Sequence, residues 1–127
     1  MLLCKTILEK SPIHGIGVFA ACDIPKGTVI WEFTDGFDQE ISAGLIEGLP
    51  APARDCILKY AYRKPDSDLY VHCADDTRFF NHSENPTITS TSVDGPDIAA
   101  CDIRAGEELT IDYRSYDADW ERKLRSF

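Results

Sequence analysis

An eight-residue segment occurs twice in this chain, once near each end. Ala20–Gly27 reads AACDIPKG and Ala99–Gly106 reads AACDIRAG, so six of the eight positions are identical. A strand-like run follows each copy, TVIWEF after the first and, after one intervening glutamate, ELTIDY after the second. Gly27 and Gly106 can adopt the positive φ that tight turns require. The repeat therefore predicts two similar hairpins and a chain rich in β-structure.

The residues between the two copies follow a different pattern. In DQEISAGLIEGLP, residues 38–50, apolar side chains recur at helical spacing until the chain reaches a proline. In APARDCILKYAYR, residues 51–63, Pro52 lies near a predicted helix start. Both segments are expected to form short helices.

Two later segments have strand patterns. LYVHCA, residues 69–74, alternates between apolar and polar side chains, and PTITSTSVDG, residues 86–95, is rich in β-branched residues. With 127 residues, the chain has the size of one domain. We therefore predict a single domain, mainly β with short helices, made of an N-terminal β part (1–34), a helical insert (35–69) and a C-terminal β part with a tail (70–127).

Charge and composition restrict the partners. The 22 acidic and 13 basic residues give a net charge of −9, whereas nonspecific nucleic-acid binding needs clustered cations, so no direct nucleic-acid partner is expected. An acidic surface suits a basic partner such as a lysine-bearing peptide, although a merely solvated surface is the plainer explanation. No stretch approaches the roughly 20 apolar residues of a membrane span, and the start MLLCKTILEK is charged too early for a secretory signal. We expect a cytoplasmic protein, or a nuclear one in a eukaryotic host.

The cysteines do not suggest a metal site or a disulfide framework. Their number is odd and no C-x-x-C pair occurs; they are Cys4, Cys22, Cys56, Cys73 and Cys101. Zinc sites usually show closer ligand spacing. We therefore predict reduced thiols and no structural zinc.

Three short segments carry the candidate chemistry. SPIHGIGVFA (11–20) has glycines on either side of Ile16, which lets the backbone approach a ligand closely, although G-x-G alone also fits a plain tight turn. RFFNHSENPT (78–87) places Asn81, His82 and Ser83 after an apolar pair. GEELTIDYRSY (106–116) alternates like a half-buried strand that ends on Tyr113, a position where tyrosine is commonly core or rim.

The middle segment is neither a metal site nor a nucleophile with its base. One histidine beside an amide and a hydroxyl is not a metal-ligand set. Adjacent Ser83 and His82 side chains usually point apart, and no G-x-S-x-G elbow surrounds the serine. A ligand-holding loop remains, with an ordinary loop histidine and a capping asparagine as the alternative.

Together and in this order, the three segments resemble a SET-domain protein lysine methyltransferase. The resemblance lies in G-x-G-V-F-A, R-F-F-N-H-S-x-x-P and G-E-E-L-T-I-D-Y, and it is strongest to minimal members such as the small SET protein of a chlorella virus. Glu84 replaces the cysteine that often follows N-H-S, and Thr87 replaces an asparagine. Ile16 stands where many members carry an aromatic or charged residue, and no cysteine-rich zinc segment follows Tyr113.

The resemblance implies a site and a reaction. S-adenosylmethionine would donate a methyl group to a lysine ε-amine, with the segments bearing N-H-S and ELTIDY crossing as a pseudoknot. Asn81 would bind the methionine part of the cofactor, and His82 would meet the adenine through its backbone or fix the loop through its ring. The remaining implied roles are cofactor binding by His14, Gly15, Ile16 and Gly17, catalysis by Tyr113, and a substrate-channel lid formed by Tyr116 and Trp120.

Alternatives remain open at this point. Tyr116 and Trp120 could instead pack a C-terminal helix on the core. The domain could be a weakly catalytic SET module that binds cofactor and serves in protein interaction, or it could methylate a non-protein amine or a site other than lysine. A homodimer is compatible with the resemblance, because minimal members can complete their site by dimerising.

Overall fold

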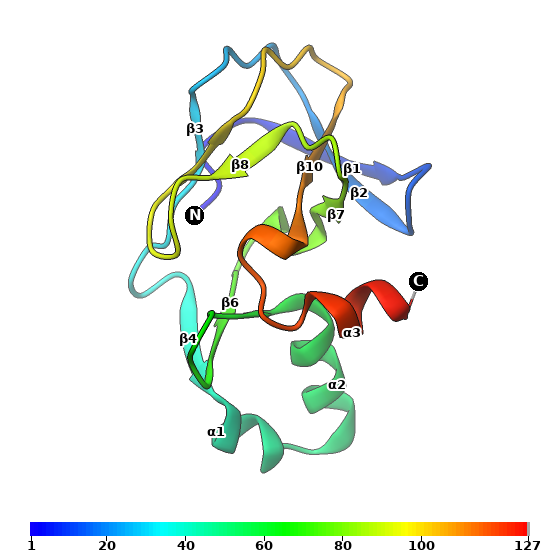
Figure 1. Ribbon diagram of the computed structural model, residues 1–127. Helices are drawn as coiled ribbons and strands as arrows, with labels where there is room; N and C mark the ends of the chain where they lie inside the picture. Colours follow the sequence, from blue (N-terminus) through cyan, green and yellow to red (C-terminus); the bar gives the residue numbers. More distant parts are fainter. Residues whose placement is uncertain (127) are drawn as a thin grey trace.

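The computed structural model describes residues 1–126, and β-structure predominates in it (Figure 1). The helices are short: α1 (Ala43–Glu47), α2 (Ala51–Tyr60), α3 (Trp120–Arg125) and the 3-10 turns η1 (Asp76–Phe79) and η2 (Tyr113–Ser115). The strands are β1 (Thr6–Lys10), β2 (Ile16–Ala20), β3 (Val29–Trp31), β4 (Gln39–Ser42), β5 (Tyr62–Arg63), β6 (Leu69–His72), β7 (Asn81–His82), β8 (Ile88–Ser90), β9 (Asp97–Ala99) and β10 (Glu108–Ile111). The predicted fold class, mainly β with short helices, is confirmed.

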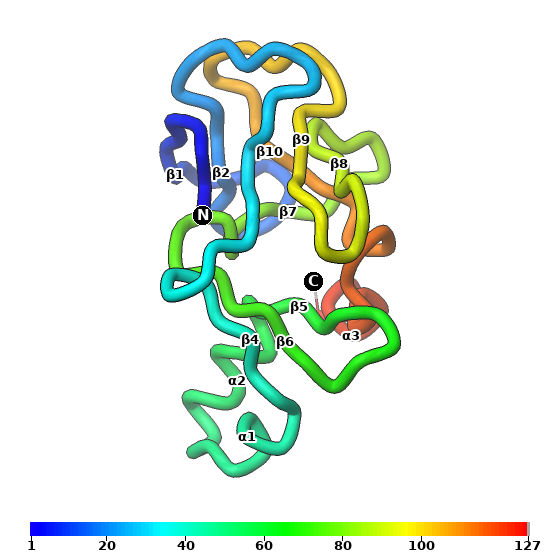
Figure 2. The backbone as a smooth tube through the Cα atoms, turned by 90° about the vertical axis from the view of Figure 1, so that its left-hand side faces the viewer, coloured from blue at the N-terminus to red at the C-terminus, as the bar shows by residue number. Residues whose placement is uncertain are grey.

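The strands form two separate sheets. The larger sheet has the order β1-β2-β10-β8-β9-β3, and β7 pairs in parallel with β10 beside β8. The smaller sheet has the order β4-β6-β5. Figure 2 shows the larger sheet at one end of the molecule, the smaller sheet below it, and α1 and α2 at the far end. Strand β10 therefore runs between β2, which follows the glycine pair, and β7, which carries Asn81.

The two copies of the repeat do not form two separate hairpins, and that prediction is wrong. Strands β2 and β3 flank the first copy, and β9 and β10 flank the second. β2 pairs with β10 and β3 pairs with β9, so the strands that flank one copy pair with the strands that flank the other. Ile24 and Ile103 exchange both backbone hydrogen bonds, at 2.7 and 2.8 Å. The side chain of Asp102 accepts from the Lys26 N–H, and Asp23 accepts from the Ala105 N–H in the equivalent way. The turns were predicted correctly in position, but their strands pair across the repeat, because pairing partners depend on tertiary packing.

The main core lies where the two copies interlock. Apolar side chains of β2, β8, β9 and β10 meet there, with the isoleucines of the repeat at the centre; its members are Val18, Ala20, Ile24, Ile30, Phe80, Ile88, Ala99, Ile103, Leu109 and Ile111. Tyr113 and Tyr116 pack against this cluster as half-buried side chains. The core thus supports one face of the candidate site directly.

The helical insert is partly as predicted. α2 begins at Ala51 with Pro52 in its first turn, in agreement with the prediction. The segment before it is helical only from Ala43, because Gln39–Ser42 forms β4 and pairs with β6. Ser42 then caps α1 by accepting the Leu45 N–H. Among residues 1–126, no helix is long and apolar enough to cross a membrane.

Candidate active site

The glycine pair lies beside Asn81, although 64 positions separate Gly17 from it in the chain. Gly15 has φ +50°, a left-handed conformation that disfavours other residues. A Cβ at Gly17 would lie only 2.0 Å from an oxygen of Glu108, so this glycine permits a close approach of β2 to that side chain. The two glycines therefore serve different purposes: Gly15 shapes the turn and Gly17 makes room.

Asn81 is buried, with 4% of its surface exposed, and its side-chain amide joins three segments. Its Nδ2 lies 3.0 Å from the His14 carbonyl and 3.3 Å from the Ile16 carbonyl. It also donates to Oε1 of Glu108 at 2.9 Å, while Oε2 of Glu108 accepts from Ser11 at 3.0 Å. Asn81 and Glu108 thus fix the glycine turn against β10.

His82 orients the backbone that leads to Tyr113. Its Nδ1 accepts the Tyr113 N–H at 3.1 Å, an arrangement that requires this nitrogen to be unprotonated. The carboxylate of Asp112 lies 3.6 Å from the same nitrogen. The His82 ring lines neither of the two cavities that border Tyr113. The structure thus places the His82 side chain in the position of a loop-fixing residue.

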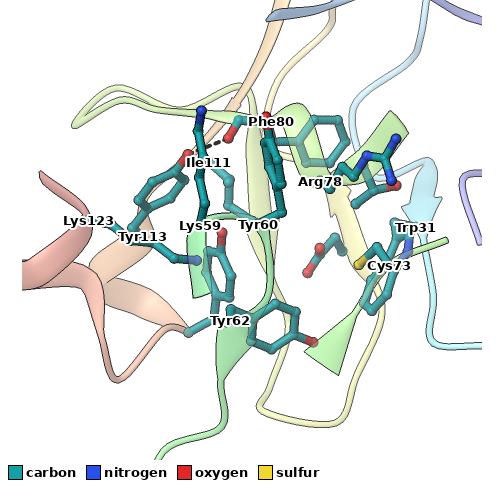
Figure 3. Close-up of a pocket in the computed structure, with 13 residues that line it drawn as sticks. Trp31, Lys59, Tyr60, Tyr62, Cys73, Arg78, Phe80, Ile111, Tyr113 and Lys123 are labelled. Atoms are coloured by element: carbon teal, nitrogen blue, oxygen red, sulfur yellow. Dashed lines mark hydrogen bonds between the residues drawn. The ribbon is translucent and has the colours of Figure 1, made fainter. Parts of the chain in front are cut away.

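Tyr113 was predicted to end the strand, but β10 ends at Ile111 and Tyr113 is the first residue of η2. Its hydroxyl donates to the Phe80 carbonyl at 2.5 Å (Figure 3). Burial, followed by the carboxylates of Asp117 and Glu108, raises the pKa of Tyr113. The hydroxyl therefore keeps its proton at neutral pH and can orient a partner, but it is a poor base.

Two adjoining cavities meet at Tyr113. The larger, of about 690 Å³, is lined by His14, Gly15, Ile16 and Asn81 on one side and by α2 and α3 on the other. The small cavity, of about 40 Å³, lies against aromatic side chains of the insert and of the C-terminal part (Figure 3). Six residues line both: Lys59, Tyr60, Arg78, Phe80, Tyr113 and Lys123.

The structure brings Tyr116 to the small cavity but not Trp120. Tyr116 lines that cavity and packs edge-on against two other tyrosine rings. Its ring centroid lies 4.9 Å from that of Tyr62 and 6.1 Å from that of Tyr113. Trp120, at the start of α3, lines neither cavity and instead borders a shallow surface hollow along α3. The channel role of Trp120 stays a prediction. From α3 it is Lys123 that reaches the small cavity, because its ammonium is drawn inward by the buried Asp117.

Several side chains of the site were missed in the sequence. Glu108 lies within the recognised G-E-E-L segment, so a signal for it was present. Tyr60 and Tyr62 lie at the end of α2 and in β5, and nothing in their spacing distinguishes them from core residues. Lys123 and Asp117 form an ion pair at 2.7 Å that only the folded chain assembles.

Asp97 lines the small cavity, and the charge of its carboxyl group changes near neutral pH. Burial raises the pKa of Asp97 to about 6, although a hydrogen bond from Ser90 acts in the opposite direction. The described residues contain no group of three or more histidine, cysteine or acidic side chains placed to hold a metal ion. The predicted lack of structural zinc stays a prediction.

Asp97→Asn is expected to stabilise the fold above pH 6 but not at pH 4. The unfolded chain loses the Asp97 proton near pH 3.9, before the folded chain does, so wild-type stability declines from about pH 4 to about pH 6. The asparagine variant lacks this decline and should gain up to about 2–3 kcal/mol relative to wild type at pH 7. Urea unfolding of both proteins across this range measures the difference. A difference in the free energy of unfolding between the two proteins that does not change with pH would contradict the raised pKa of Asp97.

Comparison with known proteins identifies similar domains. A family model described as the SET domain matches residues 15–114. Among solved structures, the Polycomb Repressive Complex 2 of Chaetomium thermophilum in an autoinhibited conformation bound to S-adenosylmethionine is 27% identical, with a TM-score of 0.66 over 95% of this chain. The same complex as a humanized mutant with an inhibitor is also 27% identical, with a TM-score of 0.65 over 94% of this chain.

These similarities cover different shares of the other proteins. This chain matches only 16% of the Polycomb chain in both structures. A Plasmodium falciparum candidate histone methyltransferase is 21% identical with a TM-score of 0.61, and the match covers 88% of this chain and 95% of that one. At that identity the likeness supports the fold alone. The Polycomb chains are therefore similar to this one in a single domain.

Proposed function

Because this chain belongs to the SET-domain family, we propose that it transfers a methyl group from S-adenosylmethionine to the ε-amine of a lysine in a protein. The observation that supports this most strongly is the meeting of the two cavities at Tyr113. One cavity has the size of a small-molecule site and the other has room for only a few water-sized groups. This arrangement suits a cofactor on one side and a lysine tip on the other.

The larger cavity fits the proposed cofactor in size and charge. Its volume of about 690 Å³ lies within the usual range for small-molecule sites. Although the protein is acidic overall, the cavity is lined by four cationic side chains and one carboxylate, namely Lys59, Arg78, Arg122, Lys123 and Asp55. Of these, the guanidinium groups of Arg78 and Arg122 suit the carboxylate of the methionine part. The glycine turn and Asn81 would hold the cofactor on the other side, and His14, Gly15 and Ile16 would contribute backbone groups.

The small cavity suits a neutral lysine amine. An amine attacks only when it is unprotonated, and the pKa of lysine in water is near 10.4. S-adenosylmethionine supplies an electrophilic methyl group whose positive sulfur disfavours a second positive charge nearby. The walls formed by Tyr62, Tyr113 and Tyr116 exclude water and further disfavour the ammonium form. Tyr113, which keeps its proton, would align the amine with the methyl carbon at about 3–3.5 Å.

The substrate is proposed to be a basic segment of a protein. The net charge of −9 favours a positively charged partner. One structure of the similar Chaetomium complex contains histone H3 carrying a trimethylated lysine. A histone-like tail is therefore one class of candidate for this chain. Its relationship to minimal SET proteins, a homodimeric state and an intracellular location stay predictions.

Asn81→Ala is expected to weaken binding of S-adenosylhomocysteine, the demethylated cofactor product, by about 10–100-fold. The variant removes an amide that fixes the His14 and Ile16 carbonyls and donates to the Glu108 carboxylate. Hydrogen bonds to charged groups contribute about 1.5–3 kcal/mol. Calorimetry measures the affinity, and thermal melting checks the fold. Asn85→Ala, at an exposed asparagine in the same loop, is the matched control. Unchanged affinity in a folded Asn81→Ala protein would contradict the assigned cofactor site.

A substrate panel tests the proposed activity against its main alternative. Histone tails and other lysine-rich proteins are incubated with labelled S-adenosylmethionine, and mass spectrometry locates the product. The proposal predicts methylation of a defined lysine in at least one substrate. Tight cofactor binding without transfer to any substrate would instead support a weakly catalytic SET module that acts in protein interaction.

A further inference from the structure

Two of the six lysines of this chain line both cavities. They are Lys59, near the end of α2, and Lys123, in α3, and Figure 3 draws both among the residues that line the small cavity. The other four line neither cavity; they are Lys5, Lys10, Lys26 and Lys64. A site that accepts a lysine amine is therefore bordered by two lysines of its own chain.

Lys123 is held firmly in place. Its ammonium lies 2.7 Å from the carboxylate of Asp117 and donates to the Ala61 carbonyl at 2.6 Å. Only 11% of its side chain is exposed. A lysine whose amine is held by a buried carboxylate and a backbone carbonyl keeps its position, so it is poorly placed to attack a methyl group.

Lys59 differs from Lys123 in each of these respects. It is exposed at the surface, and within residues 1–126 its ammonium has no ion pair or hydrogen bond. Its Nζ lies 5.2 Å from the centre of the Tyr60 ring, a contact that restrains a lysine only weakly. This side chain lies on the wall shared by the two cavities, beside the proposed site of methyl transfer.

We propose that Lys59 is a methyl acceptor within its own chain, an inference that rests on the proposed function. The unprotonated Lys59 amine forms a bond to the methyl carbon of S-adenosylmethionine. The carbon–sulfur bond breaks with its electron pair left on sulfur, and the amine proton passes to solvent. Attachment to the site gives Lys59 the high effective concentration of an intramolecular reactant.

Mapping the modified lysines tests the proposal. The purified chain is incubated alone with labelled S-adenosylmethionine, and peptide mass spectrometry quantifies methylation at all six lysines. Label should accumulate at Lys59 ahead of the exposed Lys10 and Lys26, with a rate per molecule that is unchanged over a dilution of about 100-fold. Methylation confined to other lysines, or a rate at Lys59 that rises in proportion to protein concentration, would overturn the proposal.

A mixing experiment separates reaction within one chain from reaction between chains. Tyr113→Phe protein, which keeps Lys59, is mixed with Lys59→Arg protein, which keeps Tyr113. A reaction within one chain leaves Lys59 of the mixture unmethylated. Label on Lys59 there would show transfer between chains and would contradict the proposal.

A binding readout that does not depend on turnover completes the test. Lysines are labelled with an amine-reactive reagent in the presence and absence of S-adenosylhomocysteine. Lys59 reactivity is expected to change several-fold on binding, whereas Lys10 and Lys26 should react equally in both conditions. Equal Lys59 reactivity despite measured binding would place the amine away from the cofactor and overturn the proposal.

Methylation of added peptides shows whether Lys59 alone or the whole proposed function is wrong. If peptides are methylated and Lys59 is not, only the role of Lys59 is wrong. If neither is methylated although the cofactor binds, the proposed function fails as well.

Discussion

Replacing Tyr113 by phenylalanine is expected to slow methyl transfer by about 10²–10⁴-fold, the usual effect of losing a positioned catalytic group. The variant keeps the ring that packs against Tyr116 and His82. It loses the hydroxyl that is held by the Phe80 carbonyl where the two cavities meet. Because alignment of the amine matters most in the transition state, the loss should appear in turnover and leave cofactor affinity intact.

Single-turnover transfer at saturating cofactor measures this effect, with thermal melting to confirm the fold. Tyr70→Phe is the matched control, because it also removes a buried tyrosine hydroxyl bond, to Asp119, but lies outside both cavities. A folded Tyr113→Phe protein that transfers methyl at the wild-type rate would remove Tyr113 from catalysis. Tyr116, the neighbouring tyrosine of the small cavity, would then be the next candidate.

Replacing Asp117 by asparagine is expected to lower the free energy of unfolding by about 3–5 kcal/mol, the usual cost of breaking a buried ion pair. Its carboxylate is fully buried and faces the ammonium of Lys123. It also accepts backbone N–H groups of Arg63, from the insert, and Asp119, from the C-terminal part. Burial already lowers the pKa of Lys123, and Asp117 opposes that effect, so the lone lysine would be left with an uncompensated charge.

Urea unfolding at pH 7 measures the loss. Glu121→Gln is the control, because its partner Arg125 is exposed and such surface pairs contribute less than about 1 kcal/mol. The double variant Asp117→Asn with Lys123→Met should recover part of the stability, since it replaces the stranded charge with an apolar side chain. A single variant within about 1 kcal/mol of wild type would show that the pair does not hold the C-terminal part in place.

The recognised motifs predicted which segments lie close together better than the repeat predicted the sheet. The glycine turn, Asn81 and Tyr113 are brought together, as the resemblance implied. The repeat located two turns at Gly27 and Gly106, both with positive φ. It could not show that the strands exchange partners, because the same local pattern suits a hairpin and a pair of interlocked copies. The outcome depends on Ile24 and Ile103 meeting in the core.

The walls of the small cavity were the least predictable part. Tyr62 and Tyr116 come from separate segments and meet only through the packing of the insert against the C-terminal part. Trp120 was expected at the cavity because large aromatic side chains suit a lysine channel. The buried charge of Asp117 instead draws Lys123 inward from α3. Such a pairing between buried groups leaves no periodic signal in a sequence.

The most direct test of the central claim is the chemical identity of the methylated product. A substrate found in the panel is labelled with methyl-tritiated S-adenosylmethionine in a single turnover, hydrolysed to amino acids and separated by chromatography. The account predicts label in Nε-methylated lysine, with about 10²–10⁴-fold less at the same time point when Tyr113→Phe is used. Label in any other amino acid, or equal label in lysine from both proteins, would contradict it.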